Sequence, residues 1–119
     1  MIYPVQVDAD HGLYQDARNV RLFLGLGREE FARLGGLTEE TVSHWEEGKT
    51  IEGSLRGRAE ELSGLLKSLT DVMRAESVAG WLSRPNQAFD GLKPSEVIER
   101  GDYDRIRLKI YQLQSGIPT

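Results

Sequence analysis

Residues 28–51, REEFARLGGLTEETVSHWEEGKTI, hold the pattern that decides the fold. Two helices that meet at a sharp angle need a small residue in the first helix and a glycine in the turn between them. Ala32 and Gly36 supply these two residues. Val42 and Trp45 then hold the second helix against the body of the protein, so that the four positions follow one another at offsets of 4, 6 and 3 residues. The stretch predicts a helix, a tight turn and a second helix, with Thr38 as the N-cap of the second helix.

Helical spacing continues on both sides of this stretch. Apolar residues recur at steps of three and four over residues 13–26 and again over residues 55–73. Residues 83–91 are rich in turn-forming residues, and Pro94 suits the first turn of a further helix. Asp102 is the expected cap of the last helix, whose apolar stripe is Tyr103, Ile106, Ile110 and Leu113. We find no alternating apolar run flanked by hairpin turns, so the predicted fold class is all-α.

Length and composition limit the classes of protein to consider. The chain has 119 residues, 15 basic and 19 acidic side chains, a net charge of −4 and no cysteine. It is long enough for one domain or two small fused ones, and disulfides and thiolate metal sites are excluded. No membrane-spanning run or signal sequence is found, so we expect a cytoplasmic protein. The acidic balance does not favour nucleic acid, because phosphate affinity comes largely from Lys and Arg.

Catalytic chemistry has little support in the sequence. The only histidines are His11 and His44, which are far apart and give no paired imidazole metal site. The adjacent carboxylates at 29–30, 46–47 and 60–61 point in different directions on a helix and are interpreted as solvated surface. We therefore expect no enzyme activity, no cofactor and no metal.

Residues 28–51 resemble the helix-turn-helix of Xre-type, phage-repressor-like regulators. The resemblance implies that residues 38–47 would lie in the major groove of DNA. Residues 28–49, however, hold three basic against six acidic side chains, and the predicted outward face of the second helix has no arginine. This segment is therefore either a DNA reader or a packing unit for assembly. The candidate DNA-binding residues are Arg28, Thr38, Thr41, Ser43, His44 and Lys49.

The C-terminal stretch carries the more specific pattern. From residue 79 it reads AGWLSRPNQAFDGLKPSEVIERGDYDRIRLKIYQLQSGIPT. Its order of Trp-Leu, Pro-Asn, an apolar residue and glycine, then proline, two apolar residues, glycine and an amphipathic helix resembles the C-terminal domain of Xre/MbcA/ParS-like type II antitoxins. With the upstream motif, the resemblance covers residues 13–119. From the residues themselves, Trp81 is predicted to anchor the core of this C-terminal unit.

The resemblance implies a partner and a mechanism. The partner would be a RES-domain toxin, an enzyme that degrades NAD+ and is encoded beside its antitoxin. The antitoxin would cover the active site of the toxin, with its C-terminal segment as the plug, and would repress its own operon as a complex. Large side chains with polar tips are typical interface anchors. The candidate toxin-binding residues are Arg84, Asn86, Phe89, Arg100, Tyr103, Arg107, Tyr111, Gly116, Ile117, Pro118 and Thr119.

The predicted organisation has four parts. Residues 1–12 are a flexible lead-in, 13–54 an Xre-like helix-turn-helix bundle, 55–76 a long connecting helix, and 77–119 a small helical toxin-binding domain. The connecting helix has a wide apolar stripe, which either joins the two halves or pairs with a second copy, so a homodimer is expected. The candidate dimer residues are Leu62, Leu65, Leu69 and Val72.

Other functions stay open at this point. The principal alternative is a stand-alone DNA-binding transcriptional regulator of the Xre type, whose C-terminal half only dimerises. An adaptor for an unrelated partner is a third possibility. The acidic second helix of the motif favours the antitoxin over the DNA-binding regulator, and an adjacent reading frame for a RES-like protein would discriminate between them.

Overall fold

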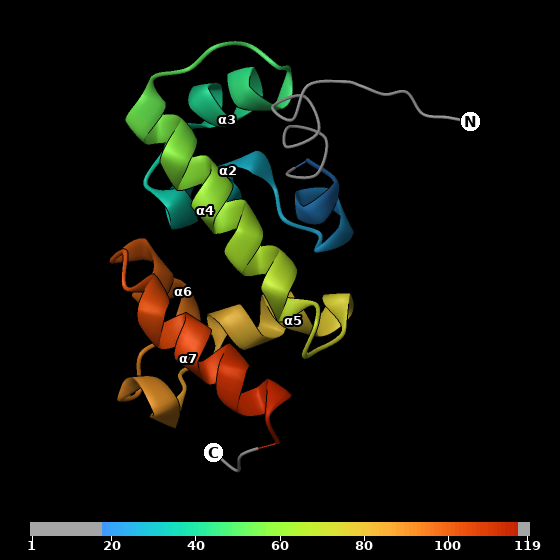
Figure 1. Cartoon of the computed structure of the whole chain (residues 1–119), viewed down its shortest axis with the longest axis vertical. Coiled ribbons are helices and arrows are strands. Elements are labelled where there is room, and N and C mark those ends of the chain that lie inside the picture. The colour runs from blue at the N-terminus through green and yellow to red at the C-terminus, as the bar shows by residue number, and fades with distance from the viewer. Residues whose placement is uncertain (1–17, 117–119) are drawn as a thin grey trace, which may run out of the picture.

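The computed structural model describes residues 18–116 and is built from helices (Figure 1). No strand occurs in that range, and the all-α prediction is confirmed. The lead-in and the start of the predicted helix over 13–26 lie outside the described residues. The order is a helical segment at 18–23, α2 (Arg28–Gly35), α3 (Glu39–Glu46), α4 (Gly53–Leu69), α5 (Ala75–Ser83), the 3-10 turn η1 (Gln87–Phe89), α6 (Pro94–Glu99) and α7 (Tyr103–Gln114).

Helix α4 runs lengthwise through the molecule and joins its two halves (Figure 1). Helices α2 and α3 pack on α4 in one half, and α7 packs on it in the other. Helix α2 also contacts α6, so the halves touch directly as well as through α4. Buried residues from both halves form one continuous apolar core.

The turn between α2 and α3 forms as the sequence predicts. Gly36 ends α2 with φ +67, a left-handed conformation that suits glycine. The Thr38 hydroxyl accepts a hydrogen bond from the backbone N–H of Thr41 at 3.1 Å, which confirms Thr38 as the N-cap of α3. Val42 and Trp45 are buried as predicted.

A buried ion-pair cluster fastens the 18–23 segment to α3. The Arg21 guanidinium donates to both carboxylate oxygens of Glu46, at 2.7 and 2.9 Å, and to the Leu26 carbonyl at 3.0 Å. Arg28 adds a bond to Glu46 at 3.2 Å. The Glu46 side chain is only 2% exposed. The prediction that Glu46 is part of a solvated acidic face is therefore wrong, because these two arginines enclose its carboxylate.

The connecting helix is shorter than predicted. It ends at Leu69, and residues 70–73 form a turn whose Thr70 hydroxyl donates to the Lys67 carbonyl at 2.6 Å. Val72 and Met73 pack from this turn against the core, and so they continue the apolar period without continuing the helix.

The leucines assigned to a dimer interface lie inside the chain itself. Leu62, Leu65 and Leu69 are all buried in its core, and Val72 is half-buried against that core. Of the two interpretations of this stripe, the structure supports a core that joins the two halves, because α2, α3 and α7 all pack on α4. A homodimer stays a prediction, without these leucines as its contact surface.

The C-terminal half begins with α5 and ends with α7. Asn86 caps η1 by accepting from the N–H of Ala88 at 2.9 Å, and Pro94 is buried at the start of α6. Trp81 is only half-buried and is not the predicted anchor. Phe89, which is 2% exposed, takes that place, and the Trp81 ring meets it edge-on at a centroid distance of 6.1 Å.

Candidate functional site

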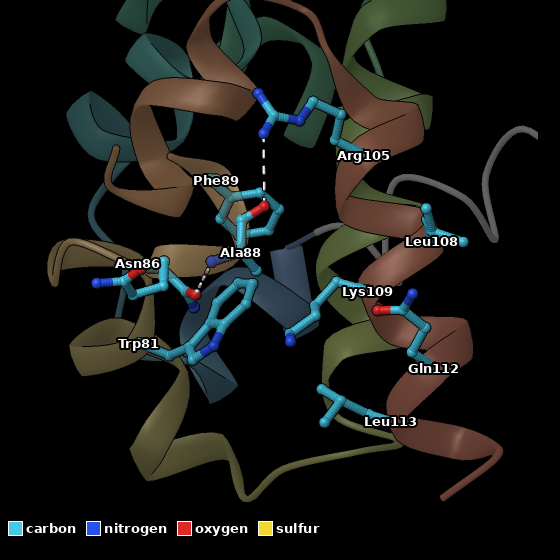
Figure 2. A pocket seen from close by; sticks show the side chains of 10 residues that line it. Trp81, Asn86, Ala88, Phe89, Arg105, Leu108, Lys109, Gln112 and Leu113 are labelled. Carbon is cyan, nitrogen blue, oxygen red and sulfur yellow. Dashed lines mark hydrogen bonds between the residues drawn. The ribbon is translucent and has the colours of Figure 1, made fainter. Parts of the chain in front are cut away.

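A groove of about 670 Å³ lies between α7 and the segment from the end of α5 through η1 (Figure 2). Helix α7 forms one wall, and Trp81 and Phe89 stand opposite it. The groove is lined by Trp81, Asn86, Gln87, Ala88, Phe89, Arg105, Leu108, Lys109, Gln112 and Leu113.

Arg105 ties α7 to η1 at one end of the groove. Its guanidinium lies 5.5 Å from the centre of the Phe89 ring and donates to the Ala88 carbonyl at 3.4 Å and to Asp90 at 3.2 Å. Asp90 is well exposed, so the ion pair is weak, and the ring contact and the carbonyl bond add to it. These contacts hold the two walls of the groove in a defined arrangement.

Exposed apolar side chains follow the outer part of α7. Leu108 is 57% exposed, and Tyr111 and Leu113 are exposed as well. The sequence stripe placed Leu113 in the core, but this residue lies on the rim of the groove. Large apolar groups that the core of the chain does not cover are typical of surfaces that bind another molecule.

The predicted toxin-binding residues are divided between two faces. Asn86 and Phe89 line the groove, whereas Arg100 and Tyr103 line a separate hollow of about 320 Å³ beside α2 and α4. Arg107 lies over the Tyr103 ring and pairs with Glu61 at 3.0 Å.

Tyr103 is a buried residue rather than an exposed anchor. Burial is the main cause that raises the pKa of its hydroxyl. Arg84 and Tyr111 are exposed, and Gly116 is exposed with φ +72. Ile117, Pro118 and Thr119 lie outside the described residues.

The sequence interpretation missed most of the wall that α7 contributes. Arg105, Leu108, Lys109 and Gln112 recur at i, i+3, i+4 and i+7, which places them on one face of α7 beside its core stripe. A leucine on a mostly polar helical face was the signal that could have identified this wall. The prediction considered only Tyr and Arg as interface anchors on α7 and therefore did not include this wall.

The candidate DNA-binding residues form no cationic surface. Arg28 bonds to Glu46, and Lys49 pairs with Glu47 at 3.0 Å. The Lys49 ammonium is the main cause that lowers the pKa of Glu47, so this carboxylate stays charged on the same face.

The remaining polar candidates make local contacts. Thr38 and Thr41 share a hydroxyl–hydroxyl hydrogen bond at 2.9 Å, and the Ser43 hydroxyl donates to Glu47 at 3.3 Å. His44 lies 4.0 Å from the Glu40 carboxylate. The surface of α3 therefore carries paired charges with an acidic excess.

Residues 18–116 hold neither a metal-binding cluster nor a membrane-spanning helix. That range contains no group of three or more His, Asp or Glu side chains arranged to hold a metal ion. None of its helices is both long and apolar enough to cross a membrane.

Comparison with known proteins points to antitoxins. No family model matches the chain. The mycobacterial cidal antitoxin MbcA of Mycobacterium bovis is 25% identical over 95 residues, which is 79% of this chain and 84% of MbcA, and MbcA of Mycobacterium tuberculosis gives the same values. A chain in the crystal structure of the M. tuberculosis MbcT–MbcA toxin–antitoxin complex superposes with a TM-score of 0.80 at 22% identity, covering 95% of this chain and 100% of that one. The resemblance to MbcA-like type II antitoxins is confirmed, and the all-helical fold is shared.

Proposed function

We propose that this chain is the antitoxin of a type II toxin–antitoxin pair, and that it binds its toxin through the C-terminal segment 77–119. The observation that carries the proposal is the groove along α7, with Leu108 and Leu113 on its wall and rim. The core of the chain makes no use of these exposed leucines, and exposed apolar anchors beside polar groups are what a protein interface needs. Similarity to MbcA supports the same proposal.

The toxin partner in this proposal is a RES-type enzyme that degrades NAD+, encoded beside this chain. Co-expression of the tagged chain with the neighbouring reading frame is the direct test. Co-elution of the neighbouring product as a stable complex is expected, and elution of the chain alone would refute the proposal.

Leu108→Glu is expected to weaken this complex by at least about tenfold, because a charge at the centre of an apolar contact must be desolvated. Leu22→Glu is the matched control, since Leu22 is 56% exposed against 57% for Leu108 and lies in the other half of the chain. Isothermal titration calorimetry on both variants makes the comparison. Equal affinities for the two would contradict a toxin contact at the groove.

Occlusion of the active site by the C-terminal tail is a separate part of the proposal. Gly116 has the left-handed backbone that releases the chain from α7, and Ile117 and Pro118 form a stiff apolar pair. Deletion of residues 116–119 is expected to leave binding largely intact and to restore most of the toxin's activity. An NAD+ consumption assay on the reconstituted complex measures this, and full inhibition by the truncated chain would exclude the plug.

Autoregulation is proposed for the toxin–antitoxin complex rather than for the chain alone. The cations Arg28 and Lys49 are engaged by carboxylates, so a positive surface for phosphates would have to come from the partner. The helix-turn-helix of residues 13–54 then contributes shape and register. A gel shift on the operon's own promoter should require the partner. A shift by the chain alone would favour the stand-alone regulator.

A further inference from the structure

Lys109 lies in an unusual position in the groove. It belongs to α7, and the residue is only 7% exposed. Figure 2 shows its side chain crossing from α7 towards Trp81, with the ammonium in the space between the walls. Within residues 18–116, no hydrogen bond or ion pair joins this ammonium to another side chain or carbonyl.

The stem of Lys109 is buried, and its ammonium, which no side chain of the described residues neutralises, is available to pair with a bound anion. The ten lining residues of the groove include two cations, Arg105 and Lys109, and no Asp or Glu, while the Asp90 carboxylate lies outside this lining and is paired with Arg105. The lining of the groove is therefore positively charged, although the whole chain has a net charge of −4. Arg105 is already engaged by Asp90 at 3.2 Å, which leaves Lys109 as the charge available to a ligand.

The walls of the groove restrict the kind of anion. Trp81 and Leu113 present apolar surface on the side of α7 where the ammonium lies. Leu108 and the amides of Asn86 and Gln112 belong to the same lining, and Leu108 projects from another side of α7. An inorganic phosphate would pair with the charge but leave that apolar surface in water. A carboxylate on a protein segment, with an apolar neighbour beside it, satisfies both parts of the groove.

We propose that Lys109 receives an Asp or Glu side chain of the partner toxin, whose flanking apolar residue packs on Trp81 and Leu113. This inference rests on the proposed antitoxin function and names the chemistry of one contact in that complex. It assigns the ion pair to the groove and not to Arg100 or Arg107.

The test measures the affinity of purified Lys109→Met for the purified product of the neighbouring reading frame. Methionine keeps most of the length and the apolar character of the lysine stem and removes the ammonium group. Lys93→Met is the matched control, because Lys93 is exposed, lies outside the groove and changes the net charge equally. Lys109→Met is expected to weaken binding by about thirtyfold or more, as when one member of a buried charge pair is truncated. Lys93→Met is expected to stay within about twofold, as for a rim charge.

Thermal unfolding of the free chain separates binding from folding. Lys109→Met should melt within a few degrees of the wild type, because the apolar stem is largely kept and no ion pair among the described residues depends on the Lys109 charge. Replacing acidic residues of the toxin one at a time by lysine should identify one position whose change restores binding to Lys109→Glu.

Each other outcome has a defined meaning. Equal affinity of Lys109→Met and Lys93→Met for the toxin would overturn this inference and leave the antitoxin proposal standing. Failure of the wild type to bind the toxin would overturn both. A third outcome is that inorganic phosphate binds saturably to the wild type but not to Lys109→Met, while both proteins bind the toxin with equal affinity. That outcome would identify a small-anion site and would also overturn the inference.

Discussion

Replacing Trp45 with alanine should lower the free energy of unfolding by about 3–5 kcal/mol, the usual cost of truncating a fully buried aromatic side chain. Trp45 is 1% exposed, and its ring stacks on Phe31 at a centroid distance of 6.4 Å. The contact joins α2 to α3, so the cavity would open where the two helices of the motif meet. Urea denaturation followed by circular dichroism measures the loss.

Trp81→Ala provides the matched comparison for that substitution. The residue type is the same, but Trp81 is half-buried on the wall of the groove. Its loss should be smaller, about 1–2 kcal/mol, because less apolar area returns to water. If the two substitutions cost the same, the assignment of Trp45 to the core and Trp81 to the groove would be wrong.

Glu46→Ala should also destabilise the chain strongly, by about 3–5 kcal/mol. The loss of the carboxylate leaves the Arg21 guanidinium, which is 7% exposed as a side chain, buried without its counter-charge. Glu60→Ala is the control, since Glu60 forms a partly exposed pair with Arg56 at 3.0 Å, and less than about 0.5 kcal/mol is expected there. Chemical denaturation of both variants gives the comparison.

A double substitution tests the cause of the Glu46 effect. Combining Arg21→Met with Glu46→Leu should recover a large part of the stability lost in Glu46→Ala, because both charges leave the interior together. No recovery would mean that Glu46 acts through packing and not through its ion pair.

The sequence was sufficient for those parts of the fold that local chemistry determines. The Gly36 turn and the Thr38 cap each depend on residues within a few positions, and both form as predicted. The predicted end of α4 was too late in the sequence, because Val72 and Met73 continue the apolar spacing of the helix although they lie in the turn that follows it. The burial of Glu46 depends on Arg21, 25 positions away, and such distant pairing leaves no local pattern.

The candidate site was predicted only in part for a similar reason. The order of motifs indicated the C-terminal half and the residues Asn86 and Phe89. It gave no information on which face of α7 stays open, because that depends on how α4, α6 and η1 pack around the helix. Of the predicted residues, Arg100 and Tyr103 therefore line a different hollow. Leu108 and Lys109, which line the groove, were not predicted.

The central claim is that this chain silences a toxic neighbour through its C-terminal half. Growth of a host in which the neighbouring gene is induced, with and without this chain, measures it most directly. Growth should stop with the neighbour alone, resume with the wild-type chain, resume with the Leu22→Glu variant and fail with Leu108→Glu. A neighbour that is harmless alone, or toxicity that persists beside the wild-type chain, would contradict the claim.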